Sequence, residues 1–118
     1  MDKKEYNRDN FCAKALLVKR NNQEQDWVKE YVTIHNIGEL RQFFKPYENY
    51  VSQIDIDNHR KVYTCIDLME NGIDAKLHIG ERVEYLVNPL LIVECNDTYP
   101  IDLSDTVEQD ILSNIELL

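Results

Sequence analysis

Short segments in which apolar and polar residues alternate run through most of this chain, and they constrain its fold more than any other feature. In residues 51–57, Ile54 and Ile56 fall on one side of an extended backbone, and Asp55 and Asp57 fall on the other. A period of two is typical of a β-strand with one buried face. Turn-forming residues separate these segments, so neighbouring strands are expected to pair as antiparallel hairpins.

Seven segments suit extended strands: residues 11–19, 27–34, 51–57, 62–68, 73–79, 83–87 and 90–95. From these segments we expect a sheet of about six short strands, in a meander-like order. Glu70-Asn71-Gly72 is the strongest hairpin signal, because Asn and Gly tolerate the positive φ of a type I′ turn. Residues 90–95 are apolar on both faces, which predicts a central strand or a strand beneath a helix.

Two segments have the 3.6-residue period of helices. Asn36, with Glu39 three residues later, forms a capping-box pattern, and Pro46 ends that helix. Ser104-Asp105 begins a second predicted helix, whose apolar stripe is Val107, Ile111, Leu112, Ile115 and Leu118. The expected fold is one α+β domain over residues 11–118, with two short helices packed on the antiparallel sheet. A polar arm, residues 1–10, precedes it.

Negative charge is concentrated in the second half of the chain. The chain carries a net charge of −9, yet residues 62–118 contain twelve acidic and two basic side chains, Lys76 and Arg82. Affinity for nucleic acid or anionic membrane depends largely on Lys and Arg, so neither is an expected direct ligand. A basic protein, in particular one that binds nucleic acid, is the complementary partner.

The sequence predicts neither a catalytic centre nor a cofactor site. Its three glycines are isolated, its histidines are scattered, and Cys12, Cys65 and Cys95 form no Cys-x-x-Cys pair. The cysteines are interpreted as small buried apolar residues. The first residues are charged and lead into no apolar signal core, so we expect a cytoplasmic protein. It is expected to be a monomer or a small homo-oligomer.

The first candidate site is an acidic surface made by outward positions of the later strands and by the last helix. It is predicted to bind the partner through Asp55, Asp57, Tyr63, Asp67, Asp74, Glu84, Asp105, Glu108 and Asp110. Like charges that lie side by side on a sheet destabilise it. A group of them is therefore expected to have a function that compensates for this loss of stability. The alternative is a solvated face that serves only solubility.

Two further patterns contain candidate site residues. Asp55, Asp57 and His59 lie at alternate positions and could converge on a divalent cation, although a backbone turn at Asp57 to Arg60 is the favoured interpretation. On the first hairpin, Trp27, Lys29 and Tyr31 form a secondary candidate surface with neighbouring basic residues. Such a surface can stack a nucleotide or act as a protein-contact hot spot.

In its size, its acidity and its lack of catalytic residues, the chain resembles small anti-defence proteins of phages and mobile elements. These include anti-CRISPR and anti-restriction proteins, and nuclease-immunity proteins follow the same logic. The resemblance implies a non-enzymatic inhibitor that binds a basic nucleic-acid-handling protein, with carboxylates that imitate phosphates. The alternatives are a module that binds or sequesters a small molecule or nucleotide, and an oligomeric structural protein that pairs through sheet edges.

Overall fold

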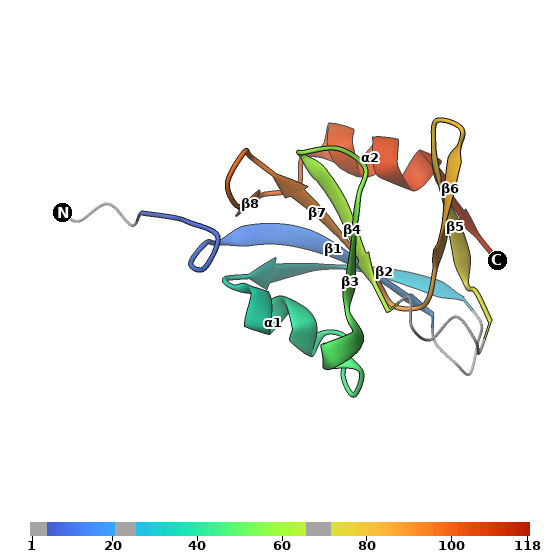
Figure 1. Cartoon of the computed structure of the whole chain (residues 1–118), viewed down its shortest axis with the longest axis horizontal. Coiled ribbons are helices and arrows are strands. Elements are labelled where there is room, and N and C mark those ends of the chain that lie inside the picture. The colour runs from blue at the N-terminus through green and yellow to red at the C-terminus, as the bar shows by residue number, and fades with distance from the viewer. Residues whose placement is uncertain (1–4, 21–25, 66–71) are drawn as a thin grey trace.

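The main sheet is built around the most apolar segment of the sequence. In a computed structural model, which describes residues 5–20, 26–65 and 72–118, this segment is the central strand β7. The strand order is β2-β1-β7-β4-β3, with the short β8 paired to β7, and every pair is antiparallel (Figure 1). The strands are β1 (Ala13–Arg20), β2 (Trp27–Ile34), β3 (Ser52–Asp55), β4 (Arg60–Thr64), β7 (Leu90–Cys95) and β8 (Pro100–Ile101).

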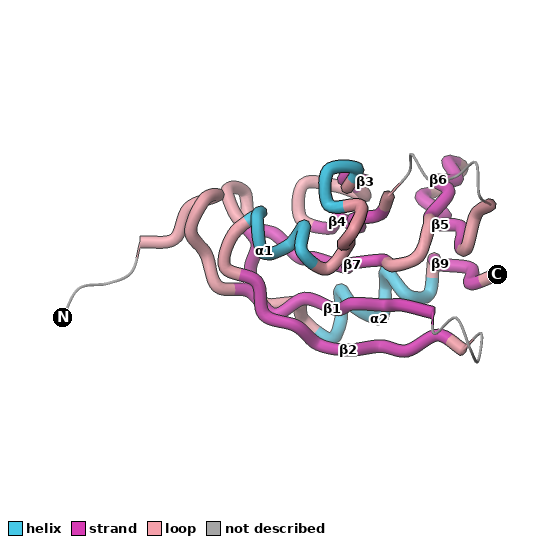
Figure 2. Tube along the Cα trace, turned by 90° about the horizontal axis from the view of Figure 1, so that it is seen from below, coloured by secondary structure: helices cyan, strands magenta, loops and turns pink. Residues whose placement is uncertain are grey.

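A second, three-stranded sheet lies at the end of the molecule that contains the C-terminus (Figure 2). Its strands are β5 (Ala75–Ile79), β6 (Arg82–Leu86) and β9 (Ile115–Leu117), in the order β6-β5-β9. Gly80, at φ +60°, lies in the tight turn between β5 and β6. The inner side chains Ala75, Leu77 and Leu86 are buried against the main sheet.

The two helices cover opposite faces of the main sheet. Helix α1 (Ile37–Gln42), followed by the 3₁₀ turn η1 (Glu48–Tyr50), packs Leu40 onto one face, and Phe44 packs beside it. Helix α2 (Asp105–Ser113) packs Ile111 onto the other face, next to the second sheet (Figure 1). Both are far shorter than a bilayer is thick, and no helix among the described residues could cross a membrane.

Because both faces are covered, the central strands are buried on both sides. In β1, Ala13, Ala15 and Leu17 contribute to the core beneath α1, whereas Leu16 and Val18 contribute to the core beneath α2. Strand β7 is buried along almost its whole length. The prediction that residues 90–95 form a central strand is therefore confirmed.

Local sequence signals position both helices. The Asn36 side chain accepts a hydrogen bond from the Glu39 backbone N–H at 2.9 Å, as the capping-box pattern predicts. The Glu39 carboxylate, however, accepts from the backbone N–H of His35 rather than from that of Asn36. Ser104 caps α2 by accepting from the Val107 N–H at 3.4 Å.

The predicted meander order is wrong, although the chain does form a single compact domain of antiparallel sheet with two α-helices in its described part. Strand β4 pairs with β3 and β7, whereas β5 pairs with β6 and β9 in the other sheet. The predicted hairpin that links 62–68 to 73–79 is therefore absent from the pairing of the described strands. Its turn at Glu70-Asn71 lies outside the described residues, and Gly72 has a positive φ of 106°.

The last helix also ends earlier than its apolar stripe predicted. The stripe continues to Leu118, but α2 stops at Ser113, and Ile115–Leu117 turn away to form β9. There Leu77 pairs with Ile115 and Ala75 pairs with Leu117 along the open edge of β5. Alternate apolar positions suit a strand as well as a helix over so short a stretch, and the available edge decided the outcome.

Candidate functional site

Helix α2 and its surroundings carry a group of carboxylates. Ile111 anchors the helix to the core, while Asp105 and Asp110 lie on its exposed side and Glu108 is half-buried. Acidic residues in the first turn complement the partial positive charge of a helix N-terminus. That electrostatic benefit is local, and it does not account for the carboxylates that surround the helix.

Those surrounding carboxylates come from β7, from the loop after β8 and from the turn after β3. Glu94 accepts hydrogen bonds from the backbone N–H and the hydroxyl of Ser104 at 2.8 and 2.9 Å, directly at the helix start. Asp102 accepts from the Lys14 backbone N–H at 2.7 Å. We define the α2 acidic surface as Asp57, Glu94, Asp102, Asp105, Glu108 and Asp110.

Two basic residues lie within this surface. Arg60 forms an ion pair with Asp57 at 2.8 Å and contacts Asp110 as well, so it joins the β3–β4 turn to α2. Lys14 lies over the Tyr31 ring, 4.8 Å from its centroid. With six carboxylates against two cations, the α2 acidic surface keeps a clear excess of negative charge.

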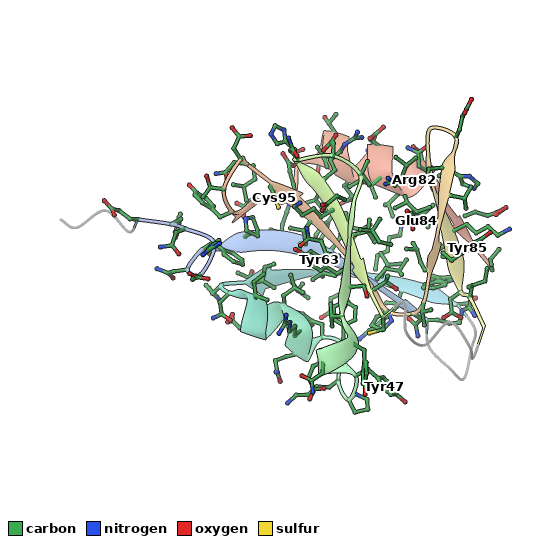
Figure 3. The ribbon with its side chains drawn as sticks, in the orientation of Figure 1. Tyr47, Tyr63, Arg82, Glu84, Tyr85 and Cys95 are labelled. Carbon is green, nitrogen blue, oxygen red and sulfur yellow. The ribbon has the colours of Figure 1, made fainter. Side chains whose placement is uncertain are left out.

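The remaining predicted acidic residues lie elsewhere, and each has a basic neighbour. Asp55 is bonded to Lys61 at 2.8 Å, Asp74 to Arg20 at 3.4 Å, and Glu84 to Arg82 at 3.2 Å (Figure 3). The structure thus brings together Asp57, Asp105, Glu108 and Asp110 but leaves Asp55, Asp74 and Glu84 outside the group. Asp67 lies outside the described residues.

Tyr63 is buried, with 6% of its surface exposed, and does not belong to an acidic surface. Its strand position pairs with Gln53, and its side chain packs in the core beneath α1 (Figure 3). The alternation placed Tyr63 correctly opposite Val62, but it gave no sign that both faces of β4 are covered. Burial raises the pKa of the Tyr63 hydroxyl far above its ordinary value of 10.

The first hairpin places Trp27, Lys29 and Tyr31 on one face with Arg20, whereas Lys19 projects from the other face. The register pairs Trp27 with Arg20, Lys29 with Val18 and Tyr31 with Leu16, so these side chains share the α2 face of the sheet. The Arg20 guanidinium lies 4.6 Å from the Trp27 ring centroid. The Tyr31 hydroxyl donates to Glu108 at 2.6 Å, so this secondary surface adjoins the α2 acidic surface.

The turn interpretation of residues 57–60 is confirmed. Asp57 Oδ1 accepts from the backbone N–H groups of His59 and Arg60 at 2.8 and 2.9 Å, a local pattern that stabilises the turn. His59 Nε2 instead faces Asp97 at 2.9 Å. Within the described residues, no group of three metal-ligating side chains lies close enough together to hold an ion.

Acid should weaken the turn through Asp57. The hydrogen bond from Arg60 holds the pKa of the Asp57 carboxyl below its ordinary value of 3.8. A carboxyl whose pKa is lower in the folded protein stabilises the fold at pH values above its ordinary pKa of 3.8. This stabilisation is lost as the pH falls through the pKa of the folded state. We therefore expect Asp57→Asn to reduce the loss of unfolding free energy between about pH 5 and pH 2, measured by urea denaturation.

Arg60→Gln is the partner variant for this measurement. It removes the same hydrogen bond from the other side and should flatten the acid dependence in the same way. A wild-type acid slope in both variants would contradict this role for Asp57.

Sequence patterns missed Glu94 and Asp102 as members of the acidic surface. Glu94 is the one charged residue in the apolar run 90–95, and Asp102 lies between that run and the second predicted helix. The position of Glu94 follows from the pairing of β7 with β4, which sets it opposite Arg60, and Asp102 directly follows β8, which pairs with β7. The sequence signal for Glu94 is that it is a single acidic residue in a segment that is otherwise apolar on both faces.

Comparison with known proteins adds no relative to this description: no family model, no curated protein and no solved structure matches the chain.

Proposed function

We propose that this protein is a non-enzymatic inhibitor of a basic nucleic-acid-handling protein, and that it binds this partner through the α2 acidic surface. The partner class is that of the targets of anti-CRISPR, anti-restriction and nuclease-immunity proteins. The observation that carries the proposal is the grouping of six carboxylates around one anchored helix. From Val83 to Leu118 the chain contains no Lys or Arg at all.

Rigid placement of these carboxylates supports the proposal. Glu94, Asp102 and Glu108 each accept a hydrogen bond from a neighbouring element, and Asp110 is held by Arg60. Charges held in fixed positions lose less conformational entropy on binding than charges on free side chains. An excess of one sign on one face also steers a basic partner toward that face and raises the association rate.

The adjoining aromatic residues give the surface an apolar margin. Tyr31 is 52% exposed beside Glu108, and Trp27 lies at the other end of the same hairpin face. Tyrosine and tryptophan are enriched at the energetic centres of protein interfaces. The proposed contact therefore combines electrostatic attraction by α2 with apolar contact by β2.

A paired charge reversal tests the proposal. Protein immobilised on resin captures its partner from host extract, and the purified pair is then measured by calorimetry. We expect Asp105→Lys with Glu108→Lys to weaken binding at least about tenfold, which corresponds to about 1.4 kcal/mol. Binding of the wild-type protein should weaken steeply with salt and compete with the partner's nucleic acid.

The matched control reverses two exposed acids outside this surface, Asp26→Lys with Glu81→Lys, which changes the net charge by the same amount. It should bind nearly as well as the wild-type protein. Equal weakening by both pairs would show that net charge alone acts. Salt-insensitive binding that leaves the nucleic acid in place would rule out phosphate mimicry.

A further inference from the structure

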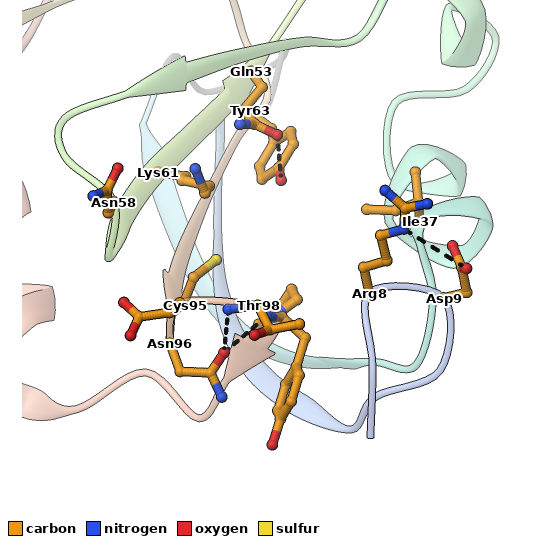
Figure 4. Close-up of a pocket in the computed structure, with 13 residues that line it drawn as sticks. Arg8, Asp9, Ile37, Gln53, Asn58, Lys61, Tyr63, Cys95, Asn96 and Thr98 are labelled. Carbon is orange, nitrogen blue, oxygen red and sulfur yellow. Dashed lines mark hydrogen bonds and ion pairs between the residues drawn. The ribbon is translucent and has the colours of Figure 1, made fainter. Parts of the chain in front are cut away.

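A cavity of about 790 Å³ opens on the α1 face of the main sheet, the face opposite to α2 (Figure 4). Its floor is formed by Gln53, Lys61, Tyr63 and Cys95, which project from β3, β4 and β7. Its walls come from the arm, α1, the β3–β4 turn and the segment between β7 and β8. The volume lies within the range of sites that hold small organic ligands, roughly 300–1,000 Å³.

A chain of hydrogen bonds fixes the polar groups of the floor. The Lys61 ammonium donates to Asp55 at 2.8 Å, and the Gln53 amide donates to the same oxygen at 2.7 Å. The Tyr63 hydroxyl donates to the Gln53 carbonyl oxygen at 3.0 Å (Figure 4). Each side chain is thereby held in one orientation, as a preorganised binding site requires.

These bonds leave the floor rich in donors. An ammonium has three N–H groups and a side-chain amide has two, so Lys61 and Gln53 each retain further donors after binding Asp55. On the wall, Asn96 uses its carbonyl oxygen to accept from the Thr98 and Tyr99 N–H groups at 2.8 Å, which leaves its amide N–H groups available. Carbonyl oxygens on a ligand would satisfy these donors.

The lining is close to neutral. Arg8 and Asp9 lie together on the arm at 4.0 Å, Asp97 faces His59, and Lys61 is already paired with Asp55. A phosphate with two negative charges would find no uncompensated cation among these groups. A neutral ligand needs no such cation, so the balanced charges of the lining do not disfavour it.

Part of the lining is apolar. Ile37, Pro100 and the rings of Tyr63 and Tyr99 provide flat or aliphatic surface. Burial raises the pKa of the Cys95 thiol to about 11, so the thiol stays neutral at physiological pH.

We propose that this cavity binds a small neutral heterocycle with ring carbonyl groups, whose oxygens accept hydrogen bonds from Lys61, Gln53 and Asn96 while the ring lies against Tyr63. The site is independent of the α2 acidic surface, because it lies on the other face of the sheet. The two proposals can therefore fail separately.

Uridine and thymine, whose rings both carry two carbonyl groups, are the neutral probes, and uridine monophosphate is the charged counterpart. Each is titrated into ¹⁵N-labelled full-length protein to about 10 mM, and chemical shifts are followed by NMR, which detects dissociation constants in the millimolar range. We expect at least one neutral probe to shift the amides of Tyr63, Asn96 and Thr98. The monophosphate should bind at least about fivefold more weakly than uridine.

Variants connect the shifts to the site. Lys61→Met removes the ammonium, and Asn96→Asp removes the amide donors while keeping an oxygen for the Thr98 and Tyr99 N–H groups. Each should raise the dissociation constant at least about fivefold, a change of about 1 kcal/mol. Lys14→Met, on the other face, should leave it unchanged. The Asn96 variant keeps the test valid if Lys61→Met does not fold.

Several outcomes would overturn the proposal. One is an absence of shifts with both neutral probes, and another is a set of shifts that map to the first hairpin. The others are monophosphate binding as tight as that of uridine, and an effect of Lys14→Met on the dissociation constant as large as that of Lys61→Met or Asn96→Asp. Partner binding through α2 would be untouched by any of these results.

Discussion

Replacing Thr64 with valine is expected to lower the free energy of unfolding by about 2–4 kcal/mol, because two buried backbone groups lose their partner. Thr64 is fully buried at the end of β4, and its hydroxyl donates to the Val87 carbonyl at 2.7 Å. The same hydroxyl accepts from the Val87 N–H at 2.9 Å. Valine has nearly the same shape, so packing is kept while both hydrogen bonds are removed.

Urea denaturation measures this effect, with Thr64→Ser and Thr98→Val as controls. Serine keeps the hydroxyl and loses one methyl group, so its cost should stay near 1 kcal/mol. The Thr98 side chain is exposed, and its replacement should change stability by less than about 0.5 kcal/mol. A Thr64→Val protein as stable as the Thr98→Val protein would show that Val87 finds another partner.

Ile111→Ala is expected to cost about 2–5 kcal/mol of unfolding free energy, the range for truncating a fully buried aliphatic side chain. Ile111 has no exposed surface and is the buried residue of α2. It packs in the core that α2 shares with β5, β6 and the main sheet. Its truncation removes apolar contacts and leaves a cavity under the helix that carries the acidic surface.

Thermal and urea unfolding measure the cost, and Thr106→Ala on the exposed side of α2 is the matched control. Because alanine has a high helix propensity and Thr106 is exposed, that substitution should be neutral or slightly stabilising. The free energy of unfolding of Ile111→Val should lie between those of Ile111→Ala and Thr106→Ala. If Ile111→Ala proved as stable as Thr106→Ala, α2 would not be anchored through Ile111.

Local patterns predicted the elements of this fold well, because strands and caps are specified by neighbours in sequence. The β1–β2, β3–β4 and β5–β6 hairpins and the Asn36 and Ser104 caps all follow from alternation and turn residues. The order of strands does not follow from them. The insertion of β7 between β1 and β4 depends on long-range pairing, which no local period records.

The candidate site was predictable to the same extent. Outward carboxylates on α2 could be read from its helical period, and so could their excess over basic residues. Which of them gather, and which are bonded to Lys61, Arg20 or Arg82, depends on contacts between segments far apart in sequence. Tyr63 was misplaced because alternation distinguishes two faces of a strand but cannot tell that both are covered.

The central position of β7 also governs the order in which the molecule can assemble. During synthesis the β1–β2 and β3–β4 hairpins are complete before β7 exists, yet Leu16 pairs with Ile92 and Val62 pairs with the same residue from the other side. Until then both hairpins expose a strand edge that invites pairing with other chains. Dominance of such distant contacts slows folding. We therefore expect a nascent chain that pauses before Leu90 to be especially prone to pairing with other chains.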